Sequence, residues 1–354
     1  MSERPRPERS FVERIWWGDD AIARFARIAL APLEGAYRGI IALRGSMYDA
    51  GLLPARKTAL PALSVGNLSV GGTGKTPFAA YVASELRARG GKPAIVLRGY
   101  GGDEPLVHAT LNPGVPVVVS PDRVAGVAQA RVLGADVAVL DDAFQHRRAE
   151  RWGDIVLVSA DRWTDARRLL PAGPWRESAR ALRRATMAVV TRKAATLEDA
   201  DVVRAALRAA VPGLSIATVL LSARELHEAT GTNTMPLDSL KGRRVHLIAA
   251  VGDPRAFTRQ VEASGATIIS SSIYPDHYRY THEDGITLAL MSAGADLVLC
   301  TLKDAVKLGP HWPVEAPRLW YVSQQVVVER EGEALSALFD GLLAARSTHK
   351  HDAG

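Results

Sequence analysis

The chain has 354 residues, of which 47% are hydrophobic and 23% charged, which excludes a disordered chain and fits two compact domains or one large one. Its 44 Lys and Arg residues exceed its 38 Asp and Glu residues, which favours an anionic partner: nucleic acid, an acidic membrane or a phosphorylated substrate. The single cysteine, Cys300, excludes an intrachain disulfide and a cysteine-built metal site. No signal-peptide pattern opens the chain, so we expect a cytoplasmic protein.

Residues 11–50 have the periodicity of an amphipathic helix, although no apolar run reaches the roughly 18–20 residues that a membrane span needs. Large apolar residues recur mostly at steps of three, four or seven: Phe11, Ile15, Ile22, Phe25, Leu33, Tyr37 and Ile40. Arginines lie between them, and Trp16 and Trp17 stand near the start. Two interpretations fit: a helix lying in a membrane interface, or an amphipathic helix packed on the protein's own core. Pro32 is expected to kink or divide the segment.

Residues 59–215 alternate between apolar strand patterns and helical patterns. The predicted strands include ALSVGN, PAIVLRGYG, VPVVVS, DVAVLDDA, DIVLVSA and MAVVTRK. Strands that are apolar throughout and separated by helices predict an α/β fold with a parallel sheet covered on both faces. We expect four parts in the chain: an N-terminal helical segment (1–58), an α/β core (59–215), a two-stranded linker (216–241) and a smaller α/β domain (242–354). The amphipathic helix 333–347 is expected to pack on that smaller domain.

The run SVGNLSVGGTGKTP, residues 64–77, has the form of a phosphate-binding loop between a buried strand and a helix. Glycines let successive backbone N–H groups converge on an anion, and the helix N-terminus adds positive charge. The residues expected to bind a nucleoside triphosphate are Gly71, Gly72, Thr73, Gly74, Lys75 and Thr76. Lys75 would reach the β- and γ-phosphates, and the Thr76 hydroxyl would bind Mg²⁺. Ser69 stands where the usual motif has its first glycine.

The run VAVLDDAFQHRR, residues 137–148, resembles a strand that ends in metal-binding carboxylates. Asp141 and Asp142 fall at the edge of a parallel sheet where ligands bind, and adjacent carboxylates on an extended chain point in different directions. We therefore expect only one of the two to address Mg²⁺. Gln145 and His146 follow at once and are suited to phosphate or substrate contacts. A solvated turn after a strand could have the same composition.

Two further loops contain groups suited to proton transfer. The run LRGYGGDEPLVH, residues 97–108, places Asp103 and Glu104 after a strand, and a carboxylate there could orient a hydroxyl and accept its proton. The same Gly-Asp-Glu-Pro sequence also makes an ordinary turn. The run SIYPDHYRYTHED, residues 272–284, contains His277, which is either a surface histidine or a group brought across a cleft to assist a carboxylate.

Together these motifs resemble one family. SVGNLSVGGTGKTP, RGYGG with DEP, DDAFQHRR, LLPAGPWRE, YPDHYRYT and TLKDAVKL occur in the order found in the tetraacyldisaccharide 4′-kinase (lipid A 4′-kinase) family, from about Trp16 to Leu308. The resemblance implies a P-loop kinase core with a smaller α/β domain. It also implies that ATP phosphorylates the 4′-hydroxyl of tetraacyldisaccharide 1-phosphate, giving lipid IVA at the cytoplasmic face of the inner membrane of a Gram-negative bacterium.

The resemblance also implies roles for individual residues. Asp103 resembles the catalytic base, supported by His277, and Lys75 serves both binding and catalysis. Gln145 and His146 correspond to nucleotide contacts. The expected ligands of Mg²⁺ are Thr76, Asp141 or Asp142, and Glu177. The N-terminal helix resembles a membrane-binding element, which favours the interfacial interpretation of residues 11–50.

Two other functions remain open at this point. A membrane-associated P-loop ATPase of the targeting or partitioning type would share the nucleotide site but needs no loops like those of Asp103 and His277. A nucleic-acid-dependent ATPase would fit the positive charge, but the arginines are scattered and aromatic residues make up only 6% of the chain. We therefore expect a lipid substrate and a membrane surface as partners, with no nucleic acid and no obligate protein partner.

Overall fold

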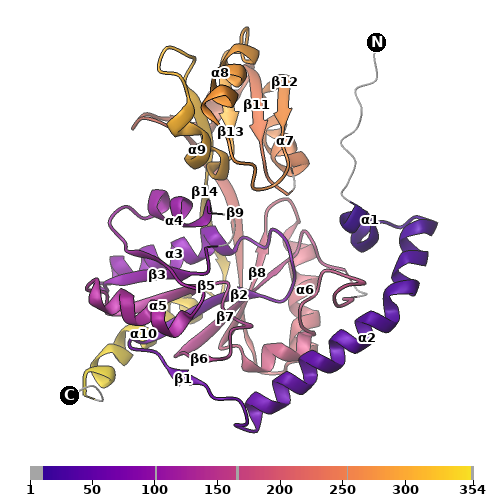
Figure 1. The fold of residues 1–354 in the computed structure, drawn as a ribbon, viewed down its shortest axis with the longest axis vertical. Coiled ribbons are helices and arrows are strands. Elements are labelled where there is room, and N and C mark those ends of the chain that lie inside the picture. The colour runs from indigo at the N-terminus through magenta and orange to yellow at the C-terminus, as the bar shows by residue number, and fades with distance from the viewer. Residues whose placement is uncertain (1–10, 100–101, 165–166, 253, 352–354) are drawn as a thin grey trace.

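The computed structural model describes residues 11–99, 102–164, 167–252 and 254–351. One sheet of twelve strands runs through the molecule, in the order β12-β11-β13-β14-β9-β8-β7-β2-β5-β3-β4 with β10 beside β9. Figure 1 shows the P-loop half (β2–β8 and their helices) below and the second half (β11–β13 and their helices) above, joined by β9 and β14. The chain is therefore an α/β protein with a parallel-sheet core and a smaller second α/β part.

The P-loop half is a parallel sheet that is buried on both faces. Its strands are β2 (Ala62–Asn67), β3 (Pro93–Leu97), β4 (Val117–Val119), β5 (Val137–Asp141), β7 (Gly153–Ser159), β8 (Met187–Arg192) and the start of β9 (Ser215–Glu228). Its helices are α3 (Lys75–Ala88), α4 (Glu104–Leu111), α5 (Arg123–Val132), η1 (Ala179–Arg184) and α6 (Leu197–Ala210). Helix α3 packs on one face, and α5 and α6 pack on the other, which is why the strands are apolar throughout. A separate two-stranded sheet pairs β1 (Arg56–Lys57) with β6 (Ala149–Glu150).

The second half is a smaller parallel sheet attached through a long antiparallel pair. Its strands are β10 (Thr234–Pro236), β11 (Arg244–Ala249), β12 (Thr267–Ile273), β13 (Leu297–Cys300) and β14 (Leu319–Arg330). Its helices are η2 (Leu237–Leu240), α7 (Pro254–Ala263), α8 (His282–Met291), α9 (Leu302–Leu308) and η3 (Gly309–His311). β14 runs antiparallel to β9 along nearly its whole length. The segment 216–241 thus contributes one strand of the connection, and its partner comes from the far end of the chain.

The C-terminal helix lies on the P-loop half, and the prediction that helix 333–347 packs on the second domain is wrong. α10 (Gly332–His351) returns from β14 and buries Leu338, Phe339 and Leu342 against α3. Arg89 at the end of α3 fastens it by donating to Ser336 Oγ (2.8 Å) and pairing with Asp340 (2.9 Å). The sequence pattern showed that one face of the helix is apolar, but the position of that face depends on β14 crossing between the halves.

The N-terminal segment forms two helices, but Pro32 does not divide them, which was one of the two effects expected of it. α1 (Phe11–Trp17) and α2 (Ala21–Asp49) are separated at residues 18–20, and Pro32 lies inside α2. Asp20 begins the second helix because its side chain accepts a hydrogen bond from the backbone N–H of Ala23 (3.0 Å). No helix among the described residues is long and apolar enough to cross a membrane.

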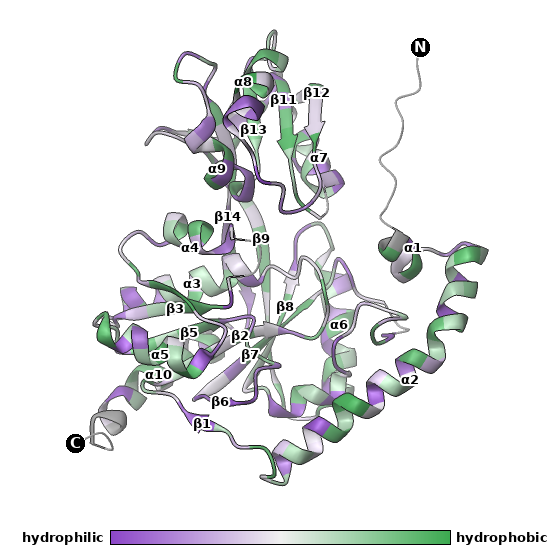
Figure 2. Ribbon diagram, in the orientation of Figure 1, coloured by the Kyte–Doolittle hydropathy of each residue, from purple (hydrophilic) through white to green (hydrophobic). Residues whose placement is uncertain are grey.

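α2 has one face on the protein and one apolar face open to solvent. On the inner face, buried Glu34 accepts from the backbone N–H of Leu169 (2.9 Å), and the Tyr37 hydroxyl donates to the Arg176 carbonyl (3.1 Å). The large apolar side chains on its open surface are Ile22, Phe25, Ile28, Leu33, Ile40 and Leu43, each at least 57% exposed. Figure 2 shows hydrophobic stretches along this helix, which Figure 1 places along the outside of the P-loop half. Packing on the protein therefore accounts for only one side of α2.

Replacing Phe339 by Ala should destabilise the P-loop half. The side chain is 1% exposed and packs with α3, so its loss should lower the free energy of unfolding by about 3–5 kcal/mol. Hydrogen exchange followed by mass spectrometry should show faster exchange in β3 and β5 and unchanged exchange in β11 and β12. Asp340→Ala, which removes the exposed partner of the Arg89 ion pair, is the control and should cost less than about 1 kcal/mol. Faster exchange in β11 instead of β5 would contradict this placement.

Candidate active site

The phosphate-binding loop is held in shape by hydrogen bonds within the protein. The chain leaves β2 at Asn67, whose side-chain amide donates to Thr73 Oγ1 (2.9 Å), while the Thr191 hydroxyl donates to the Thr73 carbonyl (2.9 Å). Gly74 has a φ of +84° just before α3, and a Cβ there would lie 2.2 Å from Leu221 Cδ1, so this position requires glycine. The loop therefore presents its backbone at the start of α3 in the arrangement that binds phosphate.

Lys75 in the first turn of α3 lies close to Asp142, which follows β5. Lys75 Nζ is 3.7 Å from Asp142 Oδ1, and Arg176 Nη1 is 3.1 Å and 3.2 Å from the two Asp142 oxygens. Burial alone would raise the pKa of the Asp142 carboxyl, but the positive charges of Lys75 and Arg176 outweigh burial and hold that pKa below its usual value. Asp142 is therefore ionised at neutral pH. Its φ of +51° turns the carboxylate out of the strand direction.

Asp141 points the other way and is held by a histidine that the sequence analysis did not identify. His108 Nε2 lies 2.8 Å from Asp141 Oδ2, and both side chains are almost fully buried. Within the described residues, Asp141 Oδ1 and His108 Nδ1 are buried without a hydrogen-bond partner. His108 lies near the C-terminal end of α4, the helix that begins next to Asp103, so this contact ties the candidate metal site to the candidate base. No local sequence signal marks a buried histidine of this kind.

Asp103 and His277, which are far apart in sequence, meet between the two halves. Asp103 immediately precedes α4 and is 1% exposed, and its Oδ1 lies 3.1 Å from His277 Nδ1. Asp103 Oδ2 is buried with no hydrogen-bond partner in the part of the chain that the structure describes. His277 has a φ of +60°, a conformation that is costly for most residues and is concentrated at functional sites. Burial, and after it the charge on Asp141, raise the pKa of neighbouring Glu104.

The remaining predicted residues are brought near the site to different degrees. Gln145 Nε2 donates to the Asn67 carbonyl (2.9 Å) at the start of the loop, and burial with nearby Arg123 lowers the pKa of His146. Glu177 forms an ion pair with Arg184 (2.9 Å). Among the described residues, no three His, Cys, Asp or Glu side chains gather as a protein-only metal site. Glu177 is therefore not brought into one cluster with Asp141 and Asp142.

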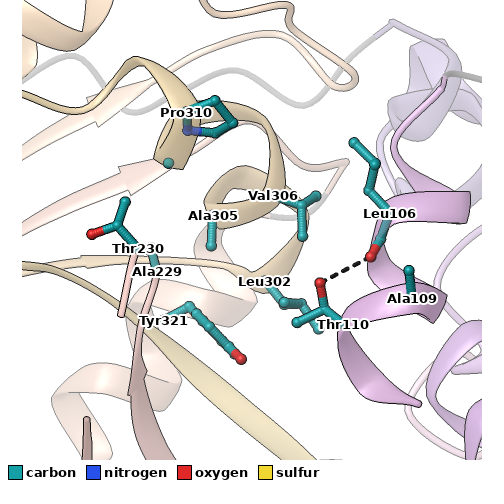
Figure 3. Close-up of a pocket in the computed structure, with 11 residues that line it drawn as sticks. Leu106, Ala109, Thr110, Ala229, Thr230, Leu302, Ala305, Val306, Pro310 and Tyr321 are labelled. Carbon is teal, nitrogen blue, oxygen red and sulfur yellow. Dashed lines mark hydrogen bonds between the residues drawn. The ribbon is translucent and has the colours of Figure 1, made fainter. Parts of the chain in front are cut away.

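An apolar cavity of about 500 Å³ lies between α4 and the second half. Leu106 and Thr110 line it from α4, Leu302 and Val306 from α9, and Tyr321 from β14 (Figure 3). The Thr110 hydroxyl donates back to the Leu106 carbonyl (2.9 Å), so it is already paired within its own helix. The residues that line the cavity include no carboxylate, histidine or lysine, whereas Asp103 lies at the N-terminal end of the same helix α4.

Comparison with known proteins identifies the family. The family model described as tetraacyldisaccharide-1-P 4′-kinase (LpxK) matches residues 26–103 and 101–343. A protein of Anaeromyxobacter sp. (strain Fw109-5) with the name tetraacyldisaccharide 4′-kinase is 38% identical over 98% of this chain and 100% of its own length. One from Geobacter metallireducens is 36% identical over 81% of this chain and 90% of its own.

A solved structure leads to the same family. The crystal structure of LpxK from Aquifex aeolicus in complex with ATP superposes with a TM-score of 0.70 at 30% identity, covering 90% of this chain and 99% of that one. The similarity in sequence and in fold thus extends over both halves and includes the P-loop and the segment around His277. The chain belongs to the tetraacyldisaccharide 4′-kinase family.

Proposed function

We propose that this protein transfers the γ-phosphate of ATP to the 4′-hydroxyl of tetraacyldisaccharide 1-phosphate, forming lipid IVA. The observation that carries the proposal is the buried Asp103 carboxylate, whose Oδ1 pairs with His277 from the other half and whose Oδ2 has no hydrogen-bond partner among the described residues. A P-loop ATPase without an acceptor has no use for such a pair. α4, which follows Asp103, packs on α3, which begins at Lys75, so base and phosphate cradle belong to one site.

Proton acceptance by Asp103 accounts for the chemistry. The 4′-oxygen forms a bond to the γ-phosphorus while the bond from that phosphorus to the β,γ-bridging oxygen breaks, and the bonding pair leaves with ADP. The hydroxyl proton passes to Asp103 Oδ2. His277 holds the other carboxylate oxygen, Oδ1, and so fixes the direction of Oδ2. The P-loop, Lys75 and Arg176 then supply positioning and charge stabilisation, which provide most of the rate in phosphoryl transfer.

The residues near the cradle fit one Mg²⁺ bound together with ATP. Mg²⁺ in kinases is held by one or two protein oxygens, by substrate phosphates and by water, so it needs no three-residue protein cluster. Thr76 at the start of α3 offers a hydroxyl, and Asp142 offers a carboxylate with about a third of its side chain exposed. Asp141 is instead buried against His108. We assign the metal contact to Thr76 and Asp142, where Mg²⁺ would neutralise phosphate charge.

The open apolar face of α2 supports a peripheral membrane location. An amphipathic helix with exposed apolar side chains on one face and arginines beside them binds at the headgroup boundary, and anionic lipids strengthen the attraction. The acceptor is itself a lipid, so its sugar must be met at the membrane surface. We propose that α2 holds the protein at the cytoplasmic face of the inner membrane of a Gram-negative bacterium.

Asp103→Asn should lower kcat by roughly 10²–10⁴-fold, because the amide cannot accept the hydroxyl proton. ATP affinity should stay within about threefold, since Asp103 lies outside the cradle. Transfer of label from γ-labelled ATP to tetraacyldisaccharide 1-phosphate in mixed micelles measures the rate. His277→Ala should lower kcat less than Asp103→Asn does. The double variant should have nearly the same kcat as Asp103→Asn alone. The exposed Glu283→Gln is the control. Near-normal turnover of Asp103→Asn would remove Asp103 as the base.

Asp142→Asn should raise the Mg²⁺ concentration needed for half-maximal activity by roughly tenfold or more, because a carboxylate ligand is lost. Titration of Mn²⁺ into the ATP complex, followed by electron paramagnetic resonance, should show the same weakening. Asp141→Asn is the comparison, since it changes the adjacent carboxylate that His108 holds. If Asp141→Asn weakens metal binding and Asp142→Asn does not, the assignment of the two carboxylates must be reversed.

Replacing Phe25, Leu33 and Ile40 together by Ser should release the protein from vesicles of phosphatidylethanolamine and phosphatidylglycerol. Each side chain is at least 58% exposed, so the fold should survive while the apolar area available to the membrane falls. The partition coefficient should drop by roughly 10²–10³-fold in a sedimentation assay. Leu290, Met291 and Val314 of the second half, also exposed, provide the matched triple-Ser control. Equal loss in both variants would argue against α2 as the membrane contact.

A further inference from the structure

An arginine outside the motifs lies directly on the phosphate-binding loop. Arg162 follows β7, and its Nη1 would be 2.6 Å from a Cβ placed on Gly71. Gly71 is in the middle of the loop, with a φ of +100° that only glycine adopts easily. The absence of a side chain at Gly71 is thus what allows the guanidinium to approach the loop backbone.

The short loop that carries Arg162 is fixed on both sides of it. The preceding residue, Asp161, accepts hydrogen bonds from the backbone N–H groups of Lys193 (2.7 Å), Ala194 (2.7 Å) and Ala195 (2.8 Å). The following residue, Trp163, packs edge-on against Trp175, with ring centroids 5.8 Å apart. The backbone at Arg162 is therefore anchored to the loop after β8 and to the segment that runs beside the P-loop.

The guanidinium is also held from the N-terminal segment. Arg162 Cζ lies 5.9 Å from the ring centroid of Trp17, the last residue of α1, within the range of a cation–π contact. Trp16 beside it donates from Nε1 to the Pro171 carbonyl (3.0 Å), so α1 is attached to the P-loop half at this point. The side chain lies between an aromatic ring on one side and the P-loop on the other.

We propose that Arg162 is a further catalytic residue, which binds the γ-phosphate during transfer and stabilises the charge that develops on it. This rests on the proposed kinase function. Planar guanidinium groups match phosphate oxygens in a bidentate manner, and an arginine supplied within the same chain performs this role in other P-loop proteins. Lys75 and Arg176 lie on the Asp142 side of the cradle, and Arg162 approaches from the Gly71 side of the loop.

The step itself is unchanged by this assignment. The acceptor oxygen bonds to the γ-phosphorus, the bond to the bridging oxygen breaks, the electron pair leaves with ADP and the proton passes to Asp103. Arg162 exchanges no proton, because its guanidinium stays charged throughout. It donates N–H hydrogen bonds to the phosphoryl oxygens as they carry the charge, and Trp17 acts as its positioning residue.

Arg162→Ala tests this proposal through nucleotide binding as well as turnover. We expect kcat to fall by roughly 10³-fold, as for arginines that stabilise phosphoryl transfer elsewhere. ADP affinity should stay within about threefold, and binding of ADP with aluminium fluoride, which imitates the phosphoryl group in transfer, should be lost in calorimetry. Arg162→Lys should recover only a small part of both effects, because a lysine cannot form the bidentate contact.

Two further variants separate position from charge. Arg167 belongs to the same loop, and its guanidinium stacks on Trp163 with Cζ 5.2 Å from the ring centroid. Arg167→Ala should leave kcat and the affinity for ADP with aluminium fluoride within about threefold of wild type. Trp17→Leu should weaken the aluminium fluoride complex less than Arg162→Ala does, with ADP binding unchanged. Thermal melting curves of all variants check that each one is folded.

Other results would overturn the proposal. If Arg162→Ala raises KM for the lipid while kcat and the aluminium fluoride complex persist, the guanidinium binds the acceptor's 1-phosphate instead. If Arg167→Ala lowers kcat and weakens the aluminium fluoride complex as much as Arg162→Ala does, the effect comes from the loss of any positive charge in this loop. Failure of the proposed function would give a different result, because the wild type would then transfer no label to lipid. The dependence of the ADP–aluminium fluoride complex on Arg162 could still be measured, and it would still support binding of the γ-phosphate by Arg162.

Discussion

The antiparallel pairing of β9 with β14 determines where the second half lies, and the active site depends on it. On its other edge β9 pairs with β8 of the P-loop half up to Leu220, and β14 pairs with β13 of the second half up to Tyr321. Between these regions β9 and β14 alone connect the two halves of the sheet. The ion pair between Arg192 of β8 and Glu329 of β14 attaches this pair of strands to the P-loop half. Two-stranded ribbons twist strongly, so the twist of this pair decides whether His277 reaches Asp103.

The N-terminal helix and the active-site loops are bound to one another. Arg147, in the turn after the paired aspartates, donates to the Gly45 carbonyl (2.9 Å) and pairs with Asp49 (2.6 Å), both at the C-terminal end of α2. Tyr37 reaches the carbonyl of Arg176, which itself holds Asp142. The face of α2 opposite the exposed apolar side chains thus rests on the loops that carry the site. A membrane that holds the outer face would therefore set the orientation of the site toward the lipid.

The parts of the site that depend on local sequence could be predicted, and the parts that depend on distant contacts could not. The P-loop and the aspartate pair are marked by a strand, a turn and a helix start that adjoin in the chain. The residues left the meeting of Asp103 and His277 as one of two interpretations, and only the family resemblance favoured it, since the contact requires a crossing by β9 and β14. His108 and Arg162 carry no local signal at all: one is recognisable only by its buried contact with Asp141, the other only by its approach to Gly71. The place of α10 was missed for the same reason.

The charges around Asp142 link metal binding to nucleotide binding. This one carboxylate pairs with both Lys75 and Arg176, so two cations of the cradle share a single negative charge. If Mg²⁺ takes the carboxylate, both side chains lose their partner at the moment when phosphate oxygens are available to replace it. Nucleotide without metal would have to compete with Asp142 for the same two cations. The arrangement therefore favours binding of ATP and Mg²⁺ together. The phosphates replace Asp142 as partner of the two cations, and Mg²⁺ removes the competition between Asp142 and the phosphates.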